Sequence, residues 1–201
     1  MKEIIRDNFS ILFGSDGYFK LANFIQKNNF KKILILTDEN TKVHCLDLFF
    51  SNIKKTDKKI AEMVSSTSYY FSVEPGENAK NLKTSNHIWE FLTDNGFKRN
   101  DLIINLGGGM VSDLGGFVAS TYMRGIQFVN IPTTLLGMVD ASIGGKTGID
   151  LNGIKNIIGT FQFAKLVLID VEFLNSLSEK QIAAGYAEMI KHSLIDKNHE
   201  W

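Results

Sequence analysis

The sequence LIINLGGGMVSDLGGFV, residues 102–118, decides the fold of this chain. An apolar run of strand character ends in three consecutive glycines, and apolar residues at helical spacing follow, among them Leu114, Phe117 and Val118. Such a strand–turn–helix unit presents backbone N–H groups at a helix N-terminus, where phosphates bind. The strict dinucleotide fingerprint fails, because Ser112 occupies the place of its third glycine. The glycines alone leave two interpretations open, a nucleotide loop and an ordinary tight turn.

Strand and helix patterns alternate on both sides of this unit. Short apolar runs typical of buried strands occur at residues 31–37, 69–73, 127–131 and 165–170, and helical patterns at 40–50 and 78–95. This alternation is typical of an α/β protein with a parallel sheet. From Ser178 the pattern becomes helical, with Ser178 and Gln181 placed as in a capping box. We predict an α/β domain over residues 1–177 and the first helix of a truncated helical domain over 178–201.

The composition excludes several classes of protein. The 201 residues carry 22 basic and 22 acidic side chains, without the basic stripe of a nucleic-acid-binding protein. No apolar run approaches the ~18 residues of a membrane span, and no signal peptide is evident. The single cysteine, Cys45, cannot form an internal disulfide. We therefore expect a cytoplasmic protein that binds neither nucleic acid nor membranes.

The sequence GGKT, residues 144–147, invites comparison with a phosphate-binding P-loop. That motif requires a glycine where Asp140 stands, five residues before Gly145. The segment also continues into what we expect to be a glycine-spaced loop rather than a helix. We reject the P-loop but keep Lys146 as an anion ligand, because a lysine on a glycine-rich loop has few roles in packing.

Acidic residues follow two of the predicted strands. Asp38 comes directly after residues 31–37, at the position where α/β proteins bind ribose hydroxyls, but it could equally cap the next helix. Asp113 falls in the first turn after the glycines, where it could cap the helix or bind a ribose or a nicotinamide carboxamide. The sequence EPGENAK, residues 74–80, is a turn before a helix, and in isolation an ordinary loop is the simpler interpretation.

Glu188 and His192 lie one turn apart in the C-terminal helical pattern. Side chains at this spacing share a helix face, so the two could bind a metal or form an exposed ion pair. One pair does not make a site, because catalytic zinc usually has three protein ligands. Both interpretations stay open on the residues alone.

Four segments together resemble the 3-dehydroquinate synthase family of the sugar-phosphate cyclases. They are GGGMVSDLGGFVASTYMRG (107–125), IPTTLLGMVDASIGGKTGID (131–150), KNIIGTF (155–161) and AGYAEMIKHSLI (184–195), preceded in order by TDEN and EPGENAK. The resemblance implies a Rossmann-like N-terminal domain that binds NAD and a helical domain that binds a divalent metal, zinc or alternatively cobalt. It implies a homodimer of the shikimate pathway that converts 3-deoxy-D-arabino-heptulosonate 7-phosphate, a small phosphorylated sugar acid, to 3-dehydroquinate and phosphate.

The resemblance also assigns roles to individual residues. The metal ligand is Glu188, with two further ligands expected beyond Trp201, so we expect the 201-residue chain by itself to bind NAD weakly and to lack activity. The residues that would face the substrate are Asp140, Lys146, Asn156, Lys191 and, from the neighbouring subunit, Arg124. The residues that would hold NAD are Asp38, Asn40, Gly76, Glu77, Lys80, Gly108, Gly109, Met110, Asp113, Thr133, Thr134, Asp140, Lys146, Lys155, Phe173, Ser176 and Leu177.

Two alternatives compete with this hypothesis. A metal- and NAD-dependent polyol dehydrogenase on the same two-domain plan would need no anion-binding cluster, so Arg124, Lys146, Asn156 and Lys191 argue against it. A non-catalytic NAD-binding module would share the nucleotide loops but would not turn over the phosphorylated substrate.

Overall fold

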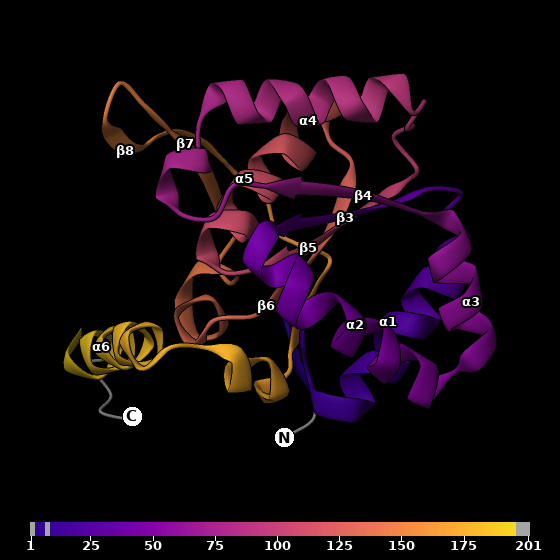
Figure 1. Cartoon of the computed structure of the whole chain (residues 1–201), viewed down its shortest axis with the longest axis horizontal. Coiled ribbons are helices and arrows are strands. Elements are labelled where there is room, and N and C mark those ends of the chain that lie inside the picture. The colour runs from indigo at the N-terminus through magenta and orange to yellow at the C-terminus, as the bar shows by residue number, and fades with distance from the viewer. Residues whose placement is uncertain (1–2, 7–8, 196–201) are drawn as a thin grey trace.

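A seven-stranded sheet forms the centre of the computed structural model, which describes residues 3–6 and 9–195 (Figure 1). All neighbouring strands are parallel except β1, which pairs antiparallel with β2 at the edge. The predicted α/β fold with a parallel sheet is confirmed. In spatial order the strands are β1 (Glu3–Ile5), β2 (Ser10–Phe13), β9 (Leu166–Ile169), β6 (Gln127–Pro132), β5 (Leu102–Gly107), β3 (Ile33–Asp38) and β4 (Ser68–Val73).

Both faces of the sheet are buried, which explains the continuous apolar runs in the sequence. Alternate residues of β3 point to opposite sides: Ile33 and Ile35 join one hydrophobic cluster, and Leu34 and Leu36 join the other. Helices α1 (Gly14–Asn28), α2 (Glu39–Thr56) and α3 (Lys58–Thr67) cover the first side. Helices α4 (Leu82–Asp94) and α5 (Gly109–Thr121) cover the second (Figure 1).

The predicted helices begin where side chains cap them. Asp38 accepts a hydrogen bond from Thr41 N at 2.8 Å at the start of α2. Ser178 and Gln181 form the predicted capping box before α6 (Glu179–Ile195), with side-chain to backbone distances of 3.4 Å in both directions. The helix expected over residues 78–95 begins later, at Leu82, because η1 (Glu77–Ala79) is a separate 3₁₀ turn.

One expectation is wrong: the segment after Lys146 is a β hairpin and not a loop. Strands β7 (Lys146–Leu151) and β8 (Ile154–Phe161) pair antiparallel outside the main sheet. Gly148 lies directly opposite Gly159, and a Cβ on Gly159 would overlap the carbonyl oxygen of Thr147. The glycines therefore allow close approach of two strands, where the sequence analysis took them as loop residues. Elements β1, β2, α1 and α3 were also not predicted.

The direction in which successive strands are added to the sheet reverses at β3. Strand β4 lies on one side of β3, and after α4 the chain crosses to β5 on the other side. In open α/β sheets, ligands bind outside the carboxyl ends of the strands at such a switch point. Asp38 at the end of β3 and Gly107 at the end of β5 mark this place.

Helix α6 lies apart from the sheet, at the lower left of Figure 1. It packs on η3 (Gly137–Ala141), a π-helical turn, where a Cβ on Gly185 would come within 2.5 Å of the Leu135 side chain. The predicted domain boundary at residue 177 falls just before α6, and the predicted helical domain stays a prediction, with residues 196–201 outside the described part. Among residues 3–6 and 9–195, no helix is both long and apolar enough to cross a bilayer.

Candidate active site

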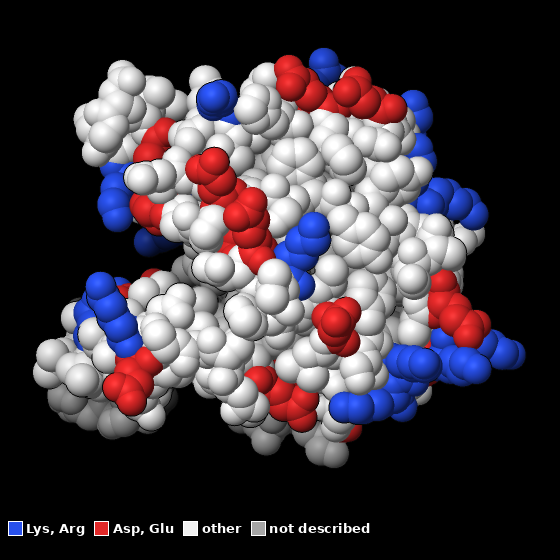
Figure 2. Space-filling view, viewed as in Figure 1, with Lys and Arg blue, Asp and Glu red and all other residues white. Residues whose placement is uncertain are grey.

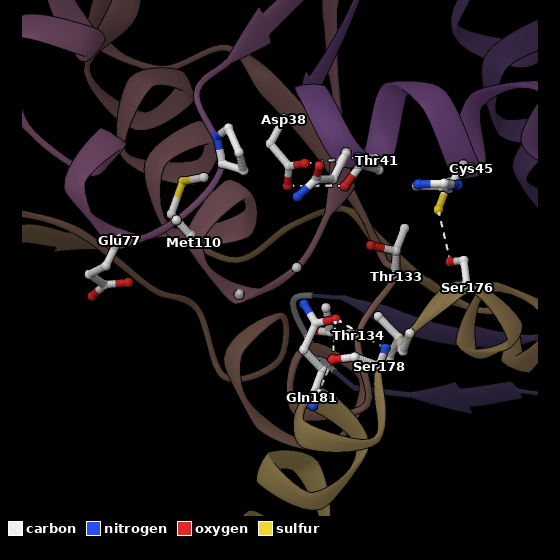
Figure 3. Close-up of a pocket in the computed structure, with 17 residues that line it drawn as sticks. Asp38, Thr41, Cys45, Glu77, Met110, Thr133, Thr134, Ser176, Ser178 and Gln181 are labelled. Atoms are coloured by element: carbon white, nitrogen blue, oxygen red, sulfur yellow. Dashed lines mark hydrogen bonds between the residues drawn. The ribbon is translucent and has the colours of Figure 1, made fainter.

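The first cavity lies at the switch point of the sheet and has a volume of about 510 Å³. Its walls come from the end of β3, the turn before η1, the N-terminus of α5, the segment after β6 and the end of η4 (Figure 3). Of the residues assigned to NAD by resemblance, those that line it are Asp38, Asn40, Gly76, Glu77, Gly108, Gly109, Met110, Thr133, Thr134, Ser176 and Leu177.

The N-terminus of α5 gives this cavity its capacity for anions. Gly108 is the N-cap residue and has no side chain to offer, so the first N–H groups of the helix, which lack acceptors within it, remain available at the wall. Neighbouring residues pack against the backbone here: a Cβ on Gly108 would lie 2.9 Å from the Thr134 side chain, and one on Gly109 would lie 2.9 Å from Ala141 Cβ. The glycines therefore let neighbouring residues pack closely against the backbone at this turn.

Asp38 caps α2 and also lines the first cavity. Its two oxygens accept hydrogen bonds from Thr41, 2.8 Å from the backbone nitrogen and 3.0 Å from Oγ1, so it caps α2. The carboxylate also lines the first cavity (Figure 3). Each oxygen keeps a lone pair for a further donor, which is what a ribose hydroxyl provides.

The second cavity, of about 560 Å³, lies between α5, η3, the β7–β8 hairpin and α6. Figure 2 shows an indentation between α6 and the hairpin, with acidic and basic side chains near it. Predicted substrate residues from distant parts of the chain meet there: Asp140, Lys146, Asn156 and Lys191. Two lysines beside hydroxyl groups of Thr147 and Thr160 can bind an anion such as a phosphate.

Lys80 joins the two cavities. Its side chain is 3% exposed, and its ammonium lies 3.0 Å from Glu77 in the first cavity and 3.2 Å from Asp113 in the second. It also donates to Asn156 Oδ1 at 2.6 Å and lies 3.8 Å from Asp150. Asn156 has a left-handed backbone (φ 53°), which this contact and the bond from its N–H to Asp150 Oδ1 hold in place. Lys80 lines neither cavity and instead holds the residues that do.

Burial changes the acid–base properties of this ion pair. Removal from water raises the pKa of Asp113 from 3.8 to about 6, although Lys80 acts in the opposite direction. Burial alone would lower the pKa of Lys80, but the nearby carboxylates of Asp113 and Glu77 outweigh it and raise that pKa. Lys80 therefore stays charged at neutral pH, and Asp113 begins to take up a proton just below it.

Besides Lys80 and Glu188, three residues assigned by resemblance line neither cavity. Arg124 is exposed in η2 (Tyr122–Arg124) with φ 65°, beyond the residues that line the second cavity. Phe173 belongs to η4 (Val171–Ser176) and is buried in the core, with 1% of its surface exposed. Lys155 projects from the hairpin and forms an exposed ion pair with Glu77 at 3.6 Å. Their assigned roles stay predictions.

The first cavity also has lining residues that were not predicted from the sequence. Thr41, His44 and Cys45 come from one face of α2, and Ser178 and Gln181 come from the capping box of α6. Helical spacing after Asp38 could have indicated the first group. Burial raises the pKa of the Cys45 thiol, so it stays neutral at physiological pH and offers a weakly polar contact.

Metal-ligating side chains gather at the junction of η3 and α6. One ligand atom each from Asp140, Glu188 and His192 lies within 4.8 Å of the others. Two carboxylates and one imidazole suit a divalent transition metal. The residues present therefore fit the metal that the resemblance implies at Glu188.

The sequence matches one protein family and several of its members. A family model described as 3-dehydroquinate synthase N-terminal matches residues 70–184. A 3-dehydroquinate synthase of Pelagibacter ubique is 42% identical over 190 residues, which are 94% of this chain and 49% of the relative. A bifunctional 3-dehydroquinate synthase/phosphatase of Fusobacterium nucleatum is 39% identical over 201 residues, all of this chain and 28% of the relative. The chain thus spans about half the length of such relatives, or less.

Solved structures share the fold. A 2-deoxy-scyllo-inosose synthase, complexed with carbaglucose-6-phosphate, NAD+ and Co2+, matches 100% of this chain and 53% of its own, with a TM-score of 0.82 and 24% identity. A 2-epi-5-epi-valiolone synthase from Streptomyces hygroscopicus subsp. jinggangensis, with NAD+ and Zn2+ bound, matches 98% and 52%, with a TM-score of 0.75 and 26% identity. An iron-containing alcohol dehydrogenase from Thermococcus thioreducens matches 95% and 53%, with a TM-score of 0.72 and 15% identity.

Proposed function

Because this chain belongs to the 3-dehydroquinate synthase family, we propose that it forms the NAD-binding part of such a synthase. It would convert 3-deoxy-D-arabino-heptulosonate 7-phosphate to 3-dehydroquinate and phosphate. NAD would occupy the first cavity and the phosphorylated sugar acid the second. The observation that carries the proposal is the Lys80 network, which joins a helix-N-terminal anion cavity to a lysine-lined cavity. Two adjoining cavities of these kinds suit a dinucleotide and an anionic substrate that must meet.

The cofactors would supply the chemistry that side chains lack: NAD accepts and returns a hydride, and a divalent metal stabilises negative charge on a substrate oxygen. NAD and a metal, Co2+ or Zn2+, occur in related structures. In this chain, Lys146 and Lys191 would hold the phosphate and carboxylate through charge-assisted hydrogen bonds. Asp140, which lines the same cavity, would accept a hydrogen bond from a substrate hydroxyl group. Lys80 donates a hydrogen bond to the side-chain oxygen of Asn156. In this position, Asn156 would present its side-chain amide to the substrate.

The assembly is part of the proposal. Arg124 does not line the second cavity, and we propose that it contacts the substrate of a neighbouring subunit. Its guanidinium sits on a turn held by Arg99, which donates to Met123 O at 2.7 Å. We therefore keep the homodimer, with Arg124 acting across its interface, and a cytoplasmic location as proposals.

The polyol dehydrogenase alternative has one supporting observation, the fold shared with an iron-containing alcohol dehydrogenase at 15% identity. That likeness extends to the fold alone. Lys146 and Lys191 line the same cavity, and a neutral polyol would offer no anion to either ammonium group. The phosphorylated substrate explains the second cavity better.

A chimera tests the proposed function. Residues 1–195 are joined to the C-terminal half of the Pelagibacter ubique relative, which is 42% identical over the matched region. The chimera should bind NAD+ and release phosphate from the heptulosonate phosphate, and Lys146→Ala should abolish release while NAD+ binding persists. A chimera that binds NAD+ but releases no phosphate would show that this half is not that of a synthase. Polyol oxidation by the same chimera would favour the alternative.

A further inference from the structure

We propose that Asn130 is a positioning residue for the second cavity. A hydrogen bond from its side-chain amide fixes the end of the π-helical turn η3, which carries Asp140. Asn105 on the neighbouring strand holds Asn130 in the required orientation. The hold on η3 rests on these contacts alone, and its consequence for catalysis, through Asp140, rests on the proposed function.

Two buried carboxamides lie side by side at the centre of the sheet. Asn105 in β5 and Asn130 in β6 are partners in the register of these parallel strands, with 0% and 5% of their surface exposed. Asn105 Nδ2 donates to Asn130 Oδ1 at 2.9 Å. This bond fixes which side of the Asn130 carboxamide carries the oxygen, and Asn130 Nδ2 donates to the carbonyl oxygen of Ser142 at 3.1 Å. The pair therefore connects the sheet to the residue that follows η3.

The Ser142 carbonyl belongs to the last part of the π-helical turn. Ser142 is the C-cap of η3, where its N–H donates to Gly137 O at 3.1 Å, and the N–H of Ile143 donates to Asp140 O at 3.0 Å. Carbonyl groups at the end of a helical turn lack partners within it, and Asn130 supplies a partner for this one. Because Asp140 lies two residues before Ser142 and lines the second cavity, the bond anchors the backbone from which its carboxylate projects.

The carboxamide pair costs stability, which points to a role in position. Oδ1 of Asn105 is buried and accepts no hydrogen bond from the residues that the structure describes. Leaving such a group unsatisfied costs about 1–3 kcal/mol. Helix α5 also makes room for this oxygen, because a Cβ on Gly115 would overlap it. Two apolar side chains would avoid the cost, but they would offer no directed hydrogen bond to η3.

Packing alone leaves η3 a degree of freedom that the hydrogen bond removes. On one side Ala141 packs against the backbone of α5, where a Cβ on Gly109 would lie 2.9 Å from Ala141 Cβ. On the other side Leu135, just before the turn, packs against Gly185 of α6. Such contacts limit how far the turn can move but set its rotation weakly, whereas a hydrogen bond requires a direction as well as a distance. Loss of the Asn130 donor should therefore loosen η3 without displacing it from the site.

The test is amide hydrogen exchange of the 201-residue chain, resolved by NMR, in the double variant Asn105→Leu/Asn130→Leu. Replacing both partners by apolar side chains of similar size should leave the free energy of unfolding nearly unchanged. The amides of Ser142 and Ile143 should nevertheless exchange at least about tenfold faster, while that of Ile35 in the central strand β3 keeps its rate, because only a local opening has become easier.

Asn52→Leu is the matched control. Asn52 is a buried carboxamide in α2, 8% exposed, and donates to Asp170 Oδ2 at 3.0 Å on the opposite side of the sheet. Its loss should lower the free energy of unfolding and leave the exchange of Ser142 relative to Ile35 unchanged. An equal acceleration at Ser142 in Asn52→Leu would mean that the effect is general destabilisation, and the proposal would fail.

The same double variant, placed in the chimera with the Pelagibacter ubique half, tests the consequence for catalysis. The kcat for phosphate release should fall at least about tenfold while the affinity for NAD+ stays within about threefold, because a misdirected Asp140 weakens the reaction more than cofactor binding. Unchanged exchange at Ser142 and Ile143 would overturn the hold on η3, and an unchanged kcat would overturn the positioning role. An inactive unsubstituted chimera would remove the synthase function and this consequence with it, while the exchange rates would still decide whether Asn130 holds η3.

Discussion

The ammonium of Lys80 lies 3.2 Å from Oδ2 of Asp113, in the wall that connects the two cavities. The lysine side chain is 3% exposed and that of the aspartate 21% exposed. Such a buried pair adds little to stability as a whole, but the loss of one partner leaves a charge in a poorly solvated place. The Lys80–Asp113 ion pair therefore makes the site rigid and also sensitive to single substitutions.

Replacing the buried lysine should destabilise the protein strongly. Lys80→Met keeps the length of the side chain but leaves Asp113 and Glu77 without their shared cation, and we expect a loss of about 3–5 kcal/mol in the free energy of unfolding. Lys155→Met is the matched control, because Lys155 pairs with the same Glu77 but is 70% exposed, and its loss should cost less than about 0.5 kcal/mol. Urea denaturation measures both. Equal losses for the two variants would contradict the structural role of Lys80.

The raised pKa of Asp113 predicts a pH dependence of stability. Between the unfolded pKa of 3.8 and the folded pKa of about 6, the folded state binds more protons than the unfolded state. Asp113 therefore stabilises the fold less as pH rises through this window, by roughly 1.4 kcal/mol per unit of pKa shift. The comparison with Asp113→Asn isolates the contribution of this carboxyl group. The stability of the wild type relative to this variant should fall between about pH 4 and pH 6. A constant difference would mean that Asp113 is not desolvated.

The carboxylate of Asp38 should select NAD+ over NADP+. A 2′-phosphate near it would meet a like charge, whereas a ribose hydroxyl can donate to it. Asp38→Ser keeps a good N-cap for α2 while removing the charge, so helix stability is preserved. We expect the preference for NAD+ to decrease by about tenfold, or about 1.4 kcal/mol. Calorimetric titration with both nucleotides measures this, with the neighbouring exposed Glu39→Gln as control. An unchanged preference in Asp38→Ser would place the ribose elsewhere.

Lys146 and Arg124 should differ in their effect on phosphate binding by the 201-residue chain. Lys146 lines the second cavity, and Lys146→Ala should weaken inorganic phosphate binding by about 1.5–3 kcal/mol, roughly tenfold or more. Arg124 lies outside that cavity, so Arg124→Ala should leave the affinity of a monomer unchanged. Phosphorus NMR titration, with sedimentation to establish the oligomeric state, measures both. Weakened binding in Arg124→Ala on a monomer would show that Arg124 reaches its own cavity.

Local patterns in the sequence predicted the sheet well. Strands β3, β4, β5, β6 and β9 lie within one or two residues of the predicted ranges. The central strands β3 and β5 are buried on both faces and are therefore continuous apolar runs. Strand β1 at one edge and its neighbour β2 are too short, with three and four residues, to give such runs. The hairpin was missed because its glycines, which permit close strand approach, are the residues that usually indicate loops.

The sequence by itself determined which residues could bind anions, a ribose or a metal, and their order along the chain relative to the predicted strands. Only the tertiary structure decided which of them meet. Lys80 joins Asp113 and Asn156 across 33 and 76 residues, and Asp140 reaches His192 across 52. Strand order, the close packing of α6 on η3 and the fold of the hairpin set these distances. They depend on contacts between distant segments, which local periodicity cannot encode.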